Sequence, residues 1–164
     1  MRPQPNRKAD PNDEVIELAA SCRFDPDKWS RVAFDWGHGE LSDYDGPREW
    51  QTDINQVIRD HLANPETRYE PLQIAVASGH GIGKSAQMGM LSNWAMSCFD
   101  RAKVVITANT ETQLRTKTSP EIGQWFRRSL TGHWFDVNSK SIKTRDREAT
   151  EQWRMDFVTW SEHN

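Results

Sequence analysis

The chain has 164 residues, a formal net charge of −3 at pH 7 and two cysteines. Its length suits one domain with a substantial core, and its charge gives no global attraction to nucleic acid. Cys22 and Cys98 are far apart and form no Cys-x-x-Cys pair, which argues against a disulfide scaffold or a zinc site and favours a reducing cytoplasm.

The first residues are polar. Residues 1–13 are rich in Pro, Asn and charged groups without periodicity, so we expect a disordered tail that lacks the apolar core of a signal peptide. From Glu14, apolar residues recur at helical spacing and predict a short helix that Asp25-Pro26 ends. No apolar run in the sequence is long enough to cross a bilayer, so we expect no membrane partner.

A second helix is predicted from the start signal Asp45-Gly46-Pro47 to about Leu62. One face of it carries the residues Trp50, Ile54, Val57, Ile58 and His61. Gln51 stands one position off this stripe, where its carboxamide could pair with adenine through a donor and an acceptor together. The sequence pattern alone favours the alternative, a solvated helix glutamine.

A short apolar run, which includes Leu72, Ile74 and Val76, predicts a buried strand over 72–78 that leads into a tight turn. Residues 78–85, which we call the glycine loop, then read Ser-Gly-His-Gly-Ile-Gly-Lys-Ser. Glycines at alternate positions allow positive φ, so the backbone N–H groups can curl around an anion. The sequence therefore predicts a phosphate-binding loop between a strand and a helix.

The chemistry of this loop suits a triphosphate with Mg²⁺. The Lys84 ammonium is expected to reach the β- and γ-phosphates and the Ser85 hydroxyl to bind the metal, while the following helix adds its dipole. The first position is Ser78 instead of the usual Gly, a small residue that preserves the turn. A structural turn that ends in Lys-Ser is the alternative. The nucleotide-binding residues are predicted to be Gln51, Gly79, His80, Gly81, Ile82, Gly83, Lys84, Ser85 and Ala86.

After the loop, Met88, Leu91, Ala95 and Cys98 predict a helix from Lys84 to about Phe99 with one buried stripe and a solvent-facing side. Residues 103–108 predict a second strand, so strand, helix and strand would form a right-handed parallel α/β unit.

Polar residues follow this second strand. Thr110 and Gln113 satisfy a capping box, which explains them at least as well as a contact with phosphate or DNA. Ser119-Pro120 indicates a kink or a new helix start. The best candidate basic patch, with a solvated helix face as the alternative, consists of Arg115, Lys117, Arg127 and Arg128.

Beyond Gly132 the pattern becomes strand-like. Trp134-Phe135, Ser141-Ile142 and the alternating Trp153 to Val158 predict short antiparallel strands, and 140–151 predicts a charged loop or hairpin.

Three blocks of sequence together resemble the N-terminal ATPase region of the large terminase subunit of tailed bacteriophages. They are 46–51 (Gly-Pro-Arg-Glu-Trp-Gln), 74–85, and 107–114 (Thr-Ala-Asn-Thr-Glu-Thr-Gln-Leu). The resemblance covers most of the chain from about residue 14. It implies an α/β P-loop NTPase fold (ASCE/RecA-like) with a parallel sheet and flanking helices.

The family threads viral DNA into a capsid by hydrolysing ATP. The resemblance therefore implies ATP and Mg²⁺ as ligands, Lys84 as the catalytic cation and Gln51 on adenine. His80 stands where many members carry arginine, which weakens an extra cationic contact. Implied partners are double-stranded DNA, a portal protein, the small terminase subunit and further copies of the chain. The implied location is the host cytoplasm and, transiently, the procapsid portal.

No apolar strand after Ser85 ends in the Asp-Glu pair that such an ATPase needs, and no carboxylate cluster for a nuclease follows. We therefore expect residues 14–164 to be the N-terminal part of an ATPase domain, incomplete at its C-terminus and without the nuclease domain. Hydrolysis would then need residues beyond Asn164. Two other functions stay open, namely a non-catalytic nucleotide-binding or interaction module and a helicase-like ATPase.

Overall fold

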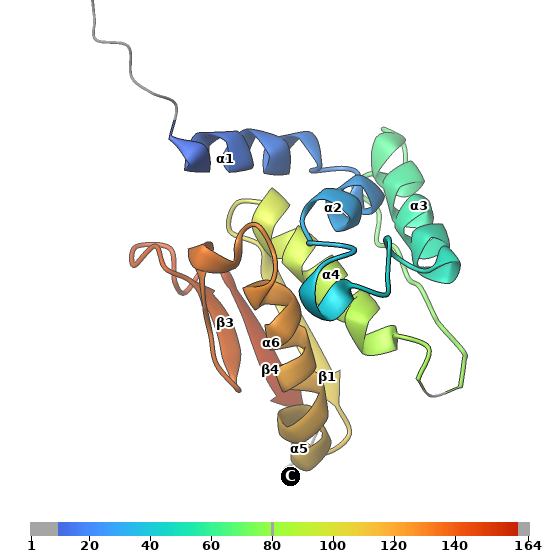
Figure 1. Ribbon diagram of the computed structural model, residues 1–164, viewed down its shortest axis with the longest axis vertical. Coiled ribbons are helices and arrows are strands. Elements are labelled where there is room, and N and C mark those ends of the chain that lie inside the picture. Colours follow the sequence, from blue (N-terminus) through green and yellow to red (C-terminus); the bar gives the residue numbers. More distant parts are fainter. Residues whose placement is uncertain (1–9, 80, 161–164) are drawn as a thin grey trace, which may run out of the picture.

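The computed structural model describes residues 10–79 and 81–160, which form an α/β fold with one four-stranded sheet and flanking helices (Figure 1). The long helices are α1 (Pro11–Ser21), α2 (Pro26–Val32), α3 (Glu49–Ala63), α4 (Lys84–Cys98) and α6 (Ser119–Arg127). The short helical segments are η1 (Gly39–Leu41), α5 (Glu111–Gln113), the π-helical η2 (Leu114–Thr118) and η3 (Gly132–Trp134). The strands are β1 (Lys103–Ala108), β2 (Phe135–Val137), β3 (Ser141–Thr144) and β4 (Arg154–Thr159).

The sheet has the order β1-β4-β3-β2 and is mixed. β1 pairs with β4 in parallel, whereas the β3–β4 and β2–β3 pairs are antiparallel. The predicted second strand and the short antiparallel strands beyond Gly132 are thus confirmed. The expectation of a parallel sheet is wrong for the pairs that β3 makes, because β2 and β3 form a local hairpin that returns the chain antiparallel to β4.

Helix α4 lies at the centre of the molecule, between two apolar clusters. One cluster joins α1, α2 and α4 around Trp29, Met90 and Trp94, and the other joins α4, α6 and the sheet around Met96 and Met155. The prediction of a single stripe with a solvent-facing side is wrong, because polar residues of α4 are also buried. Asn93, Ser97 and the Nε2 of Gln87 bond to partners inside the protein, whereas the Oε1 of Gln87 is buried without a partner among the described residues.

Asn93 illustrates this polar packing. Its Oδ1 accepts a hydrogen bond from Trp29 Nε1 at 2.9 Å, and its Nδ2 donates to Ser129 Oγ at 3.0 Å. Ser97 and Thr131 share a further buried bond of 2.7 Å between their hydroxyl oxygens. These bonds fix α4 against α2 and against the segment that follows α6.

The predicted buried strand over 72–78 does not form. Residues 71–79 have no sheet partner among the described residues, and Leu72, Ile74 and Val76 are 39%, 43% and 42% exposed. An alternating apolar segment becomes a strand only beside another strand edge, and none of the described strands pairs with it.

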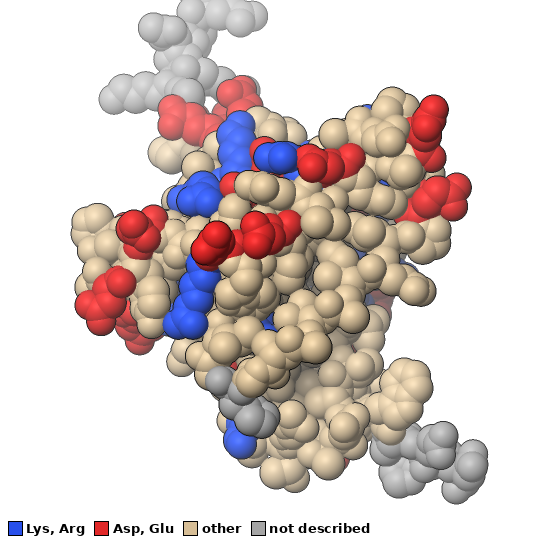
Figure 2. All heavy atoms as spheres, turned by 90° about the vertical axis from the view of Figure 1, so that its right-hand side faces the viewer, with Lys and Arg blue, Asp and Glu red and all other residues tan. Residues whose placement is uncertain are grey.

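The face seen in Figure 2 carries its acidic and basic side chains mainly in its upper half, and the lower half is mostly uncharged.

The N-terminal helices differ from prediction at their ends. α1 begins at Pro11, where Asp10 Oδ1 accepts from Asn12 N at 3.0 Å, so residues 11–13 of the expected tail are helical. Residues 1–9 lie outside the described part. Asp25-Pro26 both ends the first helical stretch and starts α2, because Asp25 caps its N-terminus. In the described residues, no helix is both long and apolar enough to traverse a bilayer.

Candidate functional site: the glycine loop and its cavity

The first turn of α3 holds the glycine loop through three side-chain donors. Arg48 Nη1 and Trp50 Nε1 each donate to the Ile82 carbonyl at 3.2 Å, and Gln51 Nε2 donates to the Gly83 carbonyl at 3.0 Å. These bonds point two consecutive loop carbonyls toward α3. The neighbouring N–H groups do not bond to α3 and stay available for a ligand, as an anion-binding loop requires.

Gln51 is 3% exposed, and both ends of its carboxamide contact backbone. Its Oε1 accepts from Arg48 N at 2.8 Å, while its Nε2 bonds to the loop as described. Gln51 also lies in the lining of the cavity next to the loop, so its predicted adenine contact stays a prediction. The sequence pattern of α3 predicted that Gln51 lies one position off the apolar stripe. In the structure, Gln51 and Asn55 are the buried residues of α3.

Two of the three loop glycines adopt the left-handed backbone that the sequence predicted. Gly81 has φ of +78° and Gly83 has φ of +90°. A Cβ on Gly83 would also lie 3.2 Å from Gln51 Nε2, so this glycine is needed both for its conformation and for the approach of Gln51. Gly79 has no atom within 4 Å of a Cβ position. His80 lies outside the described residues.

The N–H groups of Gly81, Ile82 and Gly83 donate to no described residue. The next three, from Lys84 to Ala86, belong to the first turn of α4, where intrahelical partners are missing. Six consecutive N–H groups are therefore available at the positive end of a 15-residue helix. This arrangement attracts phosphate oxygens and repels cations.

The Lys84 ammonium lies across the loop. Its Nζ donates to Ser78 O at 3.0 Å and to Gly79 O at 3.1 Å, so one of its three hydrogens is left for another acceptor. The Ser85 hydroxyl makes no hydrogen bond to any described residue and lines the cavity. Both side chains thus keep polar groups that a ligand at the loop can use.

A cavity of about 550 Å³ opens next to the loop. Its lining comes from the loop and α4, the first turn of α3, the segment before α3 and one side of α6. Trp125 of α6 reaches this lining because α4 has no side chain at Gly89, where a Cβ would lie 2.6 Å from the indole. The volume lies within the range of small-molecule sites.

Charged side chains line the cavity opposite the loop. Arg128 pairs with Glu40 and lies 5.0 Å from the centroid of the Trp125 ring. Glu121, in the first turn of α6, is the other acidic residue of the lining. Besides Arg48 and Lys84, the cavity lining therefore contains one arginine–glutamate pair and one further carboxylate.

Sequence patterns did not predict the role of several of these residues. Arg48 and Trp50 stand in the block 46–51, but no local pattern indicates that they bond to a carbonyl more than 30 positions away. The predicted basic patch is divided, because Arg115 pairs with Glu111 at 2.6 Å whereas Arg128 lines the cavity. Thr110 instead fulfils its capping prediction, since its Oγ1 accepts from Gln113 N at 3.2 Å.

The titratable groups add no nucleophile to the site. Burial raises the pKa of the Cys22 and Cys98 thiols, so both remain protonated at neutral pH. In residues 10–79 and 81–160, no group of three or more His, Cys, Asp or Glu gathers as a metal site. A metal at this cavity would accordingly depend on Ser85 and on oxygens that the ligand itself supplies.

Comparison with known proteins finds no match: no family model, no curated protein and no solved structure is significantly similar to the chain.

Proposed function

We propose that the chain binds ATP with Mg²⁺ in the cavity beside the glycine loop, as the nucleotide-binding section of a viral DNA-packaging motor of the large terminase type. One observation carries the nucleotide part of this proposal. The loop carbonyls of Ile82 and Gly83 are bonded to α3, while six successive N–H groups at the start of α4 have no acceptor among the described residues.

In this proposal the N–H groups from Gly81 to Ala86 bind the phosphates, and Lys84 adds a charged donor to the terminal ones. Ser85 is the protein ligand for Mg²⁺, and the ion would supply charge neutralisation at the phosphate oxygens. Gln51 would contact adenine in this proposal, because its two bonds to backbone leave its second amide hydrogen and its second lone pair unused.

The motor function rests on the resemblance of three sequence blocks, and two of them meet in the folded chain. Arg48, Trp50 and Gln51 from the block 46–51 all bond to the glycine loop. A nucleotide that changes the loop would thereby change the position of α3. We propose that hydrolysis is coupled in this way to movement of duplex DNA, in a P-loop NTPase assembly of several copies at a portal ring in the host cytoplasm.

A series of nucleotides tests whether the phosphate tail is what the loop recognises. We expect calorimetric affinity in the presence of Mg²⁺ to fall from ATP to ADP and to be lost with AMP, because each phosphate removed takes away charge-assisted hydrogen bonds. Equal affinity for the three nucleotides would contradict binding at the loop.

Phosphate release distinguishes a motor section from a nucleotide-binding module. We expect the 164-residue chain to bind ATP without steady turnover, because no apolar strand after Ser85 ends in the Asp-Glu pair that hydrolysis needs. Steady release that Lys84→Ala abolishes would show instead that catalysis is complete within these residues.

A further inference from the structure

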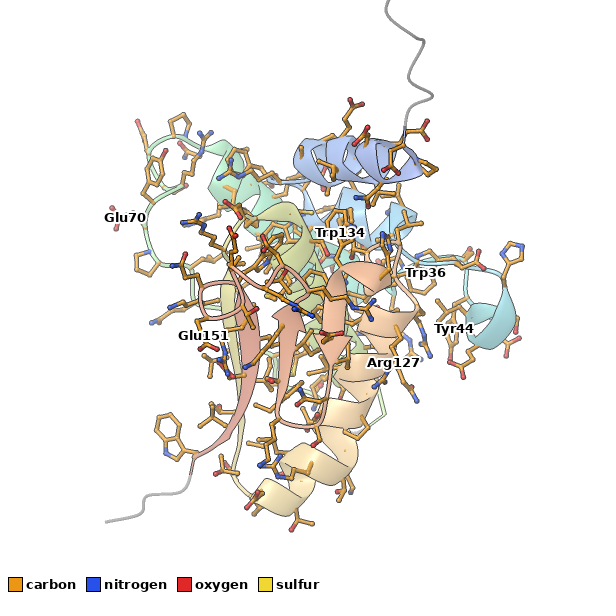
Figure 3. All side chains as sticks on the ribbon, turned by 90° about the vertical axis from the view of Figure 1, so that its left-hand side faces the viewer. Trp36, Tyr44, Glu70, Arg127, Trp134 and Glu151 are labelled. Carbon is orange, nitrogen blue, oxygen red and sulfur yellow. The ribbon has the colours of Figure 1, made fainter. Side chains whose placement is uncertain are left out.

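Arg128 is the cation that α6 contributes to the wall of the cavity beside the glycine loop. Its guanidinium lies 5.0 Å from the centroid of the Trp125 ring. Trp125 is packed in turn against Phe34 and Trp36, at centroid distances of 5.1 and 5.9 Å, and Figure 3 labels Trp36 on the segment between α2 and α3. The Arg128 side chain is 22% exposed, so its guanidinium is held at the wall and does not extend freely into solvent.

Most hydrogen-bond donors of the Arg128 side chain are unused. A guanidinium has five N–H groups. Among the described residues, this one bonds to Glu40 alone, from Nη2 to Oε2. The other N–H groups are therefore available to an acceptor in the cavity. A planar guanidinium can donate to two oxygens of one group at once, so a phosphate suits it well.

The carboxylate that holds Arg128 in the structure is a weak competitor for it. The Glu40 side chain belongs to the short segment η1 and is 76% exposed. An ion pair with an exposed partner contributes little, because water solvates its charges. A phosphate group carries more negative charge than a carboxylate and offers more oxygens, so it can displace Glu40 from the guanidinium.

The other cations of the cavity lining, Arg48 and Lys84, are attached to the glycine loop. Both donate to loop carbonyls, whereas Arg128 is paired with a carboxylate on another element. The described lining contains no further Lys or Arg. Arg128 is thus the residue that can add positive charge to a ligand from the side opposite the loop.

We infer that Arg128 is a further phosphate-binding residue of this cavity, and that Glu40 holds its guanidinium until a nucleotide binds. The inference rests on the proposed nucleotide binding at the glycine loop. When the phosphates occupy the cavity, the N–H groups of the loop bind them from one side and Arg128 from the other, while Glu40 is released to solvent. Because Arg128 directly follows α6 and the loop directly precedes α4, the ligand then links these two helices.

Calorimetry with ATP and with inorganic tripolyphosphate, both in the presence of Mg²⁺, tests this contact. For Arg128→Ala we expect about tenfold weaker binding of both ligands, because one charge-assisted contact is lost. Arg127→Ala is the matched control, since this exposed neighbour on α6, labelled in Figure 3, does not line the cavity. It should bind both ligands like the unaltered chain. Arg128→Lys keeps the charge without the planar fork and should give an intermediate affinity.

Glu40→Gln distinguishes a phosphate-binding role of Arg128 from a purely structural ion pair. If Glu40 competes with phosphate for Arg128, the variant should bind ATP about threefold more tightly. Glu121→Gln removes the other carboxylate of the lining and controls for the general loss of negative charge. In the Arg128→Ala background, Glu40→Gln should gain no more than Glu121→Gln does, because its specific effect passes through Arg128.

Equal ATP affinities of Arg128→Ala and Arg127→Ala would overturn the inference and leave the proposed function intact. Weaker ATP binding with unchanged tripolyphosphate binding would also overturn it, because Arg128 would then contact another part of the nucleotide. Weaker ATP binding by Glu40→Gln would limit the ion pair to a structural role. If the unaltered chain binds neither ligand, the proposed function fails together with the inference.

Melting temperatures establish that each variant is folded. Should Arg128→Ala not fold, Arg128→Lys and Glu40→Gln still decide the question, since the inference predicts opposite changes of ATP affinity for them.

Discussion

The molecule has two hollows of nearly equal volume, about 550 and 560 Å³, that differ in the groups they offer. The cavity beside the glycine loop presents backbone N–H groups of a loop whose carbonyls are bonded to Arg48, Trp50 and the buried Gln51. The second hollow, which we call the sheet hollow, lies beside β2, β3 and the loop between β3 and β4 and presents Lys and Arg side chains. Three of them, Lys143, Arg145 and Arg154, are paired with carboxylates. Volume therefore says little about the ligand, whereas the kind of donor, backbone N–H groups in one hollow and paired cationic side chains in the other, distinguishes the two.

The largest expected effect concerns the cavity beside the glycine loop. Lys84→Ala removes a charged donor from the loop, and loss of the one charge-assisted bond that its remaining hydrogen can make, about 1.5–3 kcal/mol, should lower ATP affinity ten- to hundredfold. Calorimetry measures the ATP affinity, with Lys28→Ala as the control for an exposed lysine elsewhere.

An ATP affinity that is the same in Lys84→Ala and in Lys28→Ala would contradict phosphate binding by Lys84 at the loop.

A smaller effect concerns the buried support of the loop. Gln51→Leu leaves the Arg48 N–H and the Gly83 carbonyl without their partner, which should lower the free energy of unfolding by about 1–3 kcal/mol. Urea denaturation measures this change. The proposed adenine contact predicts in addition that the variant loses its preference for ATP over GTP, and a retained preference would limit Gln51 to supporting the loop.

An added methyl group should destabilise the protein at Gly83 of the glycine loop but not at Gly79. Gly83→Ala forces alanine into φ of +90° and toward Gln51 Nε2, and should destabilise the protein by about 1–2 kcal/mol. Gly79→Ala is the control, because a Cβ there meets no atom within 4 Å. Equal melting temperatures for the two variants would show that the loop conformation at Gly83 does not require glycine.

The smallest effect lies outside both hollows and gives a reference for exposed charges. The Arg115 guanidinium, which donates to Glu111 at 2.6 Å, holds the pKa of that carboxyl below its usual range. Its folded-state pKa is lowered, so the pair stabilises the protein above the unfolded pKa of about 4.3. This contribution is lost as pH falls through the lower folded value. An NMR titration of Glu111 in the native protein and in Arg115→Gln should show the pKa rise in the variant.

Local patterns predicted some parts of the molecule well. Alternation in 153–158 identified the core side of β4, and the Thr110 cap and the glycines at 81 and 83 followed from their own sequence neighbourhoods. These features depend on side chains a few positions apart. Sequence periodicity and turn chemistry are sufficient for them.

Features that depend on distant partners were not predictable in this way. The buried residue Gln51 donates to Gly83 O, and the buried residue Asn55 accepts from Gln87 Nε2. No pattern within α3 reveals these distant partners. The apolar alternation of 72–76 indicated a strand, yet strand formation needs an edge to pair with. Arg128 was grouped with surface cations, whereas the packing of α6 on α4 places it in the cavity wall.

The most direct test of the account is an NMR titration of the ¹⁵N-labelled chain with ATP and Mg²⁺. If the glycine loop binds the phosphates, the largest amide shifts will fall on the consecutive residues from Gly81 to Ala86. Saturable shifts confined to the residues of the sheet hollow, or no shift in the loop at millimolar nucleotide, would contradict it.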